Sequence, residues 1–260
     1  MKILFVICTL ATSLLLLASC SKGKDDFFYK DAVLPVTIRG YNASNEALEV
    51  KLDTFRFEYS PNAIFDQTMG YSFTGQEDSI QLRITEKGNG KLVMERMLKR
   101  GAGPVSIRFL YMNGKPGNMP ELPVAEAGKI KIKYMFRPIL TNYSEPVDIA
   151  LVKYYLTPRV FEEIVRLKNV KPYEMSEPVS LSTFSTVGQQ YNGQNTPVLF
   201  RAYIYKAGTN EFYTNGTAYS WHATQSTAPL PPTTSTAARV YIFSESELNN
   251  SIRFTKNLEL

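Results

Sequence analysis

Few side chains in this sequence are of the types that carry out covalent chemistry. The chain has one histidine, His222, and two cysteines, Cys8 and Cys20. One histidine cannot build a multi-histidine zinc site, and the sequence contains no Walker A, GxGxxG or HExxH motif. Neighbouring carboxylates such as Glu162 and Glu163 point in different directions, unlike the facing pair that glycosidases use. We therefore expect no catalytic residues, no metal site, no cofactor and no enzyme activity.

Aromatic side chains are better candidates for function, because flat rings stack on the C–H faces of sugars. The chain has 16 tyrosines and one tryptophan, and several tyrosines follow or precede turn-forming asparagines. We expect four ligand-binding residues to lie within one surface region, with the tryptophan at least partly exposed: Tyr213, Tyr219, Trp221 and His222. The alternative is that Trp221 fills a hydrophobic core, which is the commoner role of tryptophan.

Alternation of apolar and polar residues indicates that the chain is mainly β. Period-two patterns predict strands over residues 36–41, 48–52, 55–59, 80–84, 105–111 and 130–136. Between 84 and 92, Gly88-Asn89-Gly90 has the turn chemistry of a β-hairpin. Strands at this spacing without intervening helices predict an antiparallel β-sandwich, Ig-like or transthyretin-like, as an N-terminal domain over residues 32–140.

The remaining residues, 141–260, predict a second β-rich domain that contains one short amphipathic helix. Strands are expected at 149–156, 179–183, 198–206, 239–243 and 252–254, and the Pro/Thr/Ser-rich residues 223–238 read as a long loop. The helix is expected at 158–168, because Thr157 can cap its N-terminus and Pro158 suits its first turn. Apolar residues at helical spacing would give this helix a buried stripe.

The N-terminus has the pattern of an export signal. Lys2 precedes an apolar run from Ile3 to Leu17, and small residues then lead to Cys20. This Leu-Ala-Ser-Cys ending resembles the lipobox of bacterial lipoproteins. The resemblance implies a signal peptide over 1–19, cleavage before Cys20, and anchoring of the protein to a membrane by acyl groups such as palmitate on Cys20. Residues 20–31, which include the polar and charged stretch Ser21–Asp26, would then form a flexible tether.

The tether adds a second resemblance, because Lys24-Asp25-Asp26 is similar to the surface-export signal of Bacteroidetes lipoproteins. It implies an outer-membrane protein at the cell surface, with the periplasmic face as the alternative. The net charge of +5 includes no dense block of Lys and Arg, so nucleic acid is not an expected partner. The expected function is non-catalytic binding of a glycan, a protein partner or a matrix component. The alternative is a structural accessory subunit of an outer-membrane uptake or surface-appendage complex.

Overall fold

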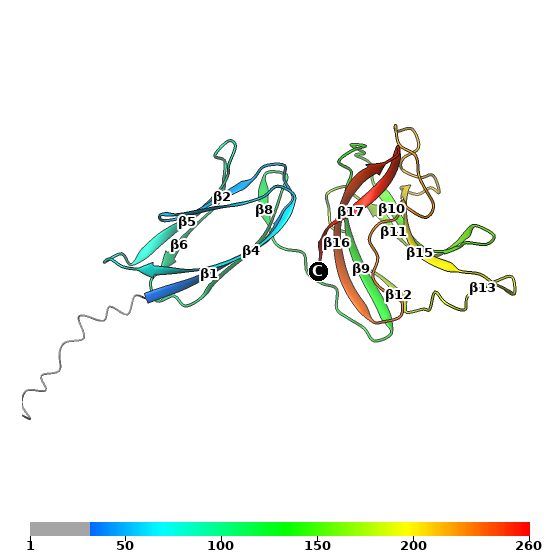
Figure 1. Ribbon diagram of the computed structural model, residues 1–260, viewed down its shortest axis with the longest axis horizontal. Coiled ribbons are helices and arrows are strands. Elements are labelled where there is room, and N and C mark those ends of the chain that lie inside the picture. Colours follow the sequence, from blue (N-terminus) through cyan, green and yellow to red (C-terminus); the bar gives the residue numbers. More distant parts are fainter. Residues whose placement is uncertain (1–31) are drawn as a thin grey trace, which may run out of the picture.

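The computed structural model describes residues 32–260, and all regular secondary structure in this part of the chain is β-strand (Figure 1). No helix among these residues is long and apolar enough to cross a membrane. The predicted signal peptide (1–19), the lipidated Cys20 and the tether (20–31) lie outside the described residues. The mainly β expectation is therefore confirmed for the described part, and the strands form two separate pairs of sheets.

The first sandwich consists of two four-stranded sheets. One sheet has the order β4 (Ala63–Phe73), β1 (Ala32–Asn42), β7 (Val105–Met112) and β8 (Lys115–Gly117). The other has the order β3 (Phe55–Tyr59), β2 (Leu48–Leu52), β5 (Ser79–Glu86) and β6 (Leu92–Lys99). Inward-facing side chains such as Val36, Ile38, Val50 and Leu82 are fully buried between the sheets. The alternation that predicted these strands thus reflects burial on one face only.

The second sandwich pairs a three-stranded sheet with a four-stranded one. The three-stranded sheet has the order β11 (Val160–Val170), β10 (Val147–Tyr155) and β15 (Val198–Lys206). The four-stranded sheet has the order β12 (Val179–Ser182), β9 (Lys129–Arg137), β16 (Ala237–Leu248) and β17 (Ser251–Glu259). A separate two-stranded hairpin is made by β13 (Gln190–Tyr191) and β14 (Gln194–Asn195). The core between the sheets includes Ile132, Phe136, Ile149 and Phe243.

Each sandwich contains one parallel strand pair, so the first is not wholly antiparallel as the sequence predicted. β1 runs parallel to β7, and β9 runs parallel to β16. In both cases the first strand of the sandwich lies beside a late strand, which requires connections that cross between sheets. The β-sandwich expectation agrees with this arrangement, and the Ig-like or transthyretin-like type stays a prediction.

The predicted helix over 158–168 does not form. Residues 156–159 make a turn, and residues from Val160 onward pair antiparallel with β10 as β11. Two register shifts interrupt this pairing, between Val147 and Ile149 and between Leu151 and Val152. Because of these shifts, the buried side chains Leu167 and Val170 are three residues apart, a spacing that also fits a helix. Tertiary pairing therefore overrode the local helical signal.

The segment 118–128 connects the sandwiches without regular structure. Residues 129–137, expected in the first domain, form β9, which pairs with β12 and β16 of the second sandwich. Its side chains Ile130 and Ile132 are buried in the second core. We propose 118–128 as the domain boundary, because the apolar contacts of the two cores separate there.

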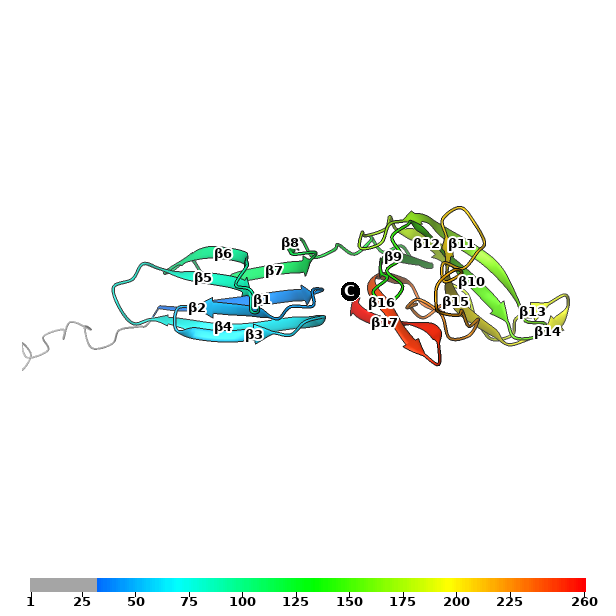
Figure 2. The ribbon, with the colours of Figure 1, turned by 90° about the horizontal axis from the view of Figure 1, so that it is seen from above.

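The two sandwiches are joined end to end (Figure 2). An apolar cluster and one buried arginine connect them. The apolar contact includes Tyr41 and Leu110 from the first sandwich and Met135 from the second. Arg137 is 4% exposed, and its guanidinium donates to the Tyr41 hydroxyl at 2.8 Å and to the Ala43 carbonyl at 2.6 Å. It also donates to Asn62 Oδ1 at 2.9 Å. These bonds fix the second sandwich to the end of β1.

Candidate functional site

The predicted ligand-binding residues lie in the segment between β15 and β16, residues 207–236, which we name the sealing loop. Its first predicted residue, Tyr213, is fully buried, and its ring packs 5.2 Å from that of Phe136. The Tyr213 hydroxyl donates to Glu245 Oε1 at 2.8 Å. Burial, followed by the negative charge of Glu245, raises the pKa of Tyr213 well above its ordinary value. Tyr213 therefore cannot stack on a ligand, which corrects the expectation for this residue.

Trp221 is half-buried and ends a column of stacked groups. Its ring lies parallel to Phe212 at 4.6 Å, and Phe212 stacks on Tyr205 at 4.9 Å. The Arg166 guanidinium covers the Tyr205 ring at 5.0 Å. Burial raises the pKa of Tyr205 to about 12, against the opposing charge of Arg166. Trp221 is therefore partly exposed, as the sequence predicted, while one of its faces is occupied by packing.

Tyr219 and His222 complete the predicted set. Tyr219 is half-buried and packs against the second core, whereas His222 is exposed. The part of the sealing loop that follows His222 bonds to the edge of β15. The backbone N–H of Ala228 donates to the Ala202 carbonyl at 3.1 Å. Thr227 Oγ1 accepts from the Ala202 N–H at 2.9 Å. These contacts show that the loop closes the side of the sandwich between β15 and β17, where Ser220 bridges to Ser251.

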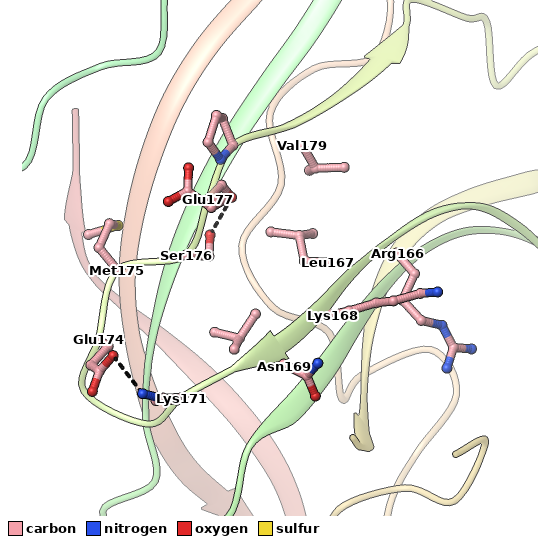
Figure 3. Close-up of a pocket in the computed structure, with 12 residues that line it drawn as sticks. Arg166, Leu167, Lys168, Asn169, Lys171, Glu174, Met175, Ser176, Glu177 and Val179 are labelled. Atoms are coloured by element: carbon pink, nitrogen blue, oxygen red, sulfur yellow. Dashed lines mark hydrogen bonds and ion pairs between the residues drawn. The ribbon is translucent and has the colours of Figure 1, made fainter. Parts of the chain in front are cut away.

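A groove of about 350 Å³ lies between β11 and β12, at the opposite side of the second sandwich (Figure 3). Its floor contains the buried Leu167 and Val179, and Lys171 and Glu174 pair across 3.8 Å at its rim. Arg166 is held by Glu163 at 2.6 Å, and this bond raises the pKa of Arg166. Arg166 also donates to the Thr209 carbonyl at 2.8 Å. The charged groups here hold protein segments together and leave a shallow gap between two strand edges.

A second hollow, of about 440 Å³, lies between the loop 183–189 and the β13–β14 hairpin. No charged side chain lines it; its walls are Thr186, Val187, Gly188, Gln189, Asn195, Thr196 and Pro197. Gln189 Nε2 donates to the Ser185 carbonyl at 2.7 Å, and Asn195 Oδ1 accepts from Gln190 Nε2 at 3.1 Å. Val187 is 82% exposed beside these amides. The hollow therefore combines oriented amide groups with an exposed aliphatic side chain.

Apolar and aromatic side chains border this hollow. Tyr191 of the hairpin packs 5.1 Å from Tyr155, whose hydroxyl donates to Glu162 Oε2 at 2.8 Å. Burial, and then this bond, raises the pKa of Tyr155. Leu156 is 36% exposed, and its backbone N–H donates to the Pro197 carbonyl at 3.0 Å. We name the hollow together with Leu156 and Tyr191 the distal surface.

The distal surface was not found from the sequence, because three separate segments build it. The available signal was Tyr191 beside Asn192 and Asn195, the same tyrosine-and-amide pattern that pointed to the sealing loop. Among residues 32–260, no three or more histidine, cysteine, aspartate or glutamate side chains are placed to hold a metal ion.

No protein-family model and no curated protein matches this sequence. Similar solved structures include the Bacillus anthracis TIE protein, with 8% identity and a TM-score of 0.21 over 65% of this chain. This chain spans 31% of that protein. The tip fimbrial protein Mfa3 from Porphyromonas gingivalis has 13% identity and a TM-score of 0.22, covering 86% of this chain and 98% of that one. A candidate adhesin from Bacteroides ovatus has 9% identity and a TM-score of 0.22, covering 86% of this chain and 92% of that one. Likenesses of this size show neither the sandwich type nor a function.

Proposed function

We propose that this protein is a non-catalytic, lipid-anchored outer-membrane protein that binds a neutral saccharide at the distal surface. The lipid on Cys20 and the surface location come from the N-terminal resemblance to bacterial lipoproteins. The observation that carries the binding proposal is the uncharged hollow beside β13 and β14, with its oriented amides and exposed Val187. Concave sites with a few convergent polar groups on a rigid scaffold are typical of ligand binding.

The place of the distal surface supports this proposal. β1 starts at one end of the molecule, and the β13–β14 hairpin lies at the opposite end (Figure 2). Arg137 and the apolar cluster between the sandwiches hold these two ends in one orientation. A tether attached before β1 would therefore place the distal surface away from the membrane.

The chemistry of the hollow favours a neutral sugar over an ionic ligand. Its threonine hydroxyls and its Asn195 amide can donate and accept hydrogen bonds, as sugar hydroxyls require. The Gln189 amide beside them is held in place by the Ser185 carbonyl and by Lys153 Nζ at 3.4 Å. Val187 and Pro197 offer aliphatic contacts to the C–H faces of the ring. Lys153 contacts Gln189 Oε1 at 3.4 Å but is not among the wall residues, so an anionic ligand would face no cation in the hollow itself.

The test is a glycan-array screen of the Cys20→Ser protein, followed by calorimetric titration of the best saccharide. The double variant Gln189→Ala/Asn195→Ala should weaken binding at least about tenfold, which corresponds to about 1.4 kcal/mol. Gln81→Ala, which removes an exposed amide from the first sandwich, is the matched control and should bind as the parent does.

Two results would contradict the proposal. Binding that survives the double variant and is lost in Tyr219→Ala would place the site on the sealing loop. No saccharide binding, together with a co-purifying outer-membrane protein, would support the alternative of an accessory subunit. The anchor is tested separately: the parent should fractionate with membranes, and the Cys20→Ser protein should not.

A further inference from the structure

The edge strands of the two sandwiches are protected against pairing with other chains to different degrees. Proteins usually blunt such edges with bulges, charges, prolines or short strands. In the described residues, β6, β11 and β17 each carry several charged side chains, and their pairings contain register shifts. β8 spans three residues around Pro116, and β12 spans four residues. Strand addition is therefore disfavoured at these edges.

β4 has none of these protections. It spans 11 residues, and its register with β1 is unbroken from Ala63 to Phe73. Its one charged residue, Asp66, is neutralised by Arg39 at 2.8 Å. A long, regular and nearly uncharged edge offers a row of unpaired backbone N–H and C=O groups to another strand.

The side chains along this edge are also apolar. β3 and β4 lie along the same side of the first sandwich (Figure 2). The rings of Tyr59 on β3 and Phe65 on β4 stack at 4.1 Å. On this side Phe55 is 53% exposed and Ile64 is 58% exposed. In the second sandwich the corresponding open side is covered by the sealing loop, whereas no described loop covers β3 and β4. A partner at this edge would thus remove apolar surface from water.

The other side of the first sandwich differs in charge. β8 covers β7 only from Leu110 to Met112, and a hollow of about 380 Å³ lies beside the rest of β7. Arg96 and Arg108 line this hollow. Two copies meeting there would bring like charges together, which is unfavourable. The β4 edge is the side on which two copies can approach without that cost.

We propose that β4 pairs antiparallel with β4 of a second copy of this chain, about a two-fold axis near Thr68. This register places Phe65 opposite Tyr71 of the second copy, and Gln67 opposite Met69. Asp66 then faces Gly70, so no like charges are opposed. Opposite residues also belong to the same face of the sheet, because positions alternate with period two. Phe65 and Tyr71 are already buried in their own core, so backbone pairing and outward-facing side chains such as Ile64 supply the new contact.

This self-complementarity is why we expect the partner at β4 to be a second copy of the chain. A two-fold contact uses the same patch on both copies, and closes after two subunits. The two four-stranded sheets that contain β4 would join into one continuous sheet. The inference is independent of the proposed saccharide site, which lies on the second sandwich.

Sedimentation velocity of the Cys20→Ser protein tests the proposal directly. We expect a reversible monomer–dimer equilibrium with a Kd on the order of micromolar. Ile64→Lys should raise this Kd at least about tenfold, because it places a charge at the paired edge. Met97→Lys on β6 is the matched control, since Met97 is 59% exposed against 58% for Ile64, and should leave the Kd unchanged.

Disulfide trapping tests the register. In a Cys8→Ser/Cys20→Ser background, Thr68→Cys would bring two thiols to opposite positions, about 4.5–5.5 Å between Cβ atoms. A shift of about 1 Å then reaches the disulfide range of about 3.5–4.5 Å. It should form a covalent dimer much faster than Met97→Cys. The proposal is overturned by a monomer throughout the concentration range, by a dimer that Ile64→Lys leaves intact, or by equal cross-linking of the two cysteine variants.

Discussion

The two sandwiches share a strand plan and differ in how their sides are closed. Each has its first strand parallel to a late one, β1 to β7 and β9 to β16. In the second sandwich, the sealing loop inserts Tyr213 and Trp221 along the side between β15 and β17. In the first sandwich, Phe55 stays about half exposed between β3 and β4. The same class of side chain is therefore core in one sandwich and open surface in the other.

This difference in how the sides are closed indicates where partners can bind. A side that the chain closes with its own aromatic loop has its ring faces occupied, as with the column from Arg166 to Trp221. A side without such a loop retains unpaired backbone groups and apolar surface. Aromatic residues near turns thus indicate function only where no strand edge needs covering.

Among the variants considered, Trp221→Ala should lower the free energy of unfolding most. Trp221→Ala would leave Phe212, Tyr203 and Phe254 without their packing partner. We expect a loss of about 3 kcal/mol in the free energy of unfolding, measured by urea titration. Phe55→Ala, on the open side of the first sandwich, should cost less than about 1 kcal/mol. Equal losses would mean that the two sides are closed alike.

Loss of Arg137, which connects the two sandwiches, should give the next largest decrease in the free energy of unfolding. Arg137→Ala would leave the Tyr41 hydroxyl and the Ala43 carbonyl without their donor. We expect a loss of about 2 kcal/mol and the separation of one calorimetric transition into two, because the sandwiches would unfold independently. Arg239→Ala is the control, since its side chain is 40% exposed and its ion pair with Glu259 is worth less than about 1 kcal/mol. A single transition in Arg137→Ala would show that the apolar cluster alone couples the sandwiches.

Each sandwich contains a buried tyrosine–glutamate hydrogen bond. Loss of the tyrosine hydroxyl should lower the free energy of unfolding less, and by different amounts in the two sandwiches. Tyr111 donates to Glu86, which has one other side-chain donor, Asn89 at 2.6 Å. Tyr213 donates to Glu245, which also accepts from the backbone N–H of Thr141 at 2.8 Å and from its hydroxyl at 2.6 Å. Tyr111→Phe should therefore cost about 2 kcal/mol and Tyr213→Phe about 1 kcal/mol in urea unfolding. The reverse order would contradict the assigned bonding.

The first of these pairs should also respond to pH. The Tyr111 hydrogen bond, followed by that of Asn89, lowers the pKa of Glu86 below its ordinary value of 4.5. A carboxyl whose pKa is lowered by folding stabilises the protein above its unfolded value and loses this contribution as the pH falls through the folded one. The difference in unfolding free energy between the parent and Tyr111→Phe should therefore shrink below about pH 4.5. A difference that stays constant to pH 3 would exclude this linkage.

The sequence predicted those features that depend on neighbouring residues. Alternation located β1, β2, β5, β7 and β9, and the turn at Gly90, whose φ is 70°, joins β5 to β6 as expected. β4 was missed because its edge position leaves both Ile64 and Gln67 exposed, which blurs the alternation. The helix over 158–168 was wrong because bulges in β11 imitate helical spacing. Both errors arise where strand pairing decides the exposure of a side chain.

The candidate site was harder to predict for the same reason. Whether Tyr213 is core or surface depends on Phe136 and Glu245, which lie far away in the sequence. The hollow of the distal surface needs the loop 183–189, the hairpin and Pro197 together. Local patterns identified the right kinds of residue, tyrosine beside asparagine, and could not say which strand side each loop would close.

Amide hydrogen exchange, measured strand by strand at two protein concentrations, tests the difference between the sides most directly. In dilute monomer, β15 should be protected by the sealing loop, and amides of β4 that point outward should exchange rapidly. At concentrations well above the dimer Kd, β4 should become protected while β15 is unchanged. Rapid exchange of β15 in the monomer, or protection of β4 that does not depend on concentration, would contradict the account.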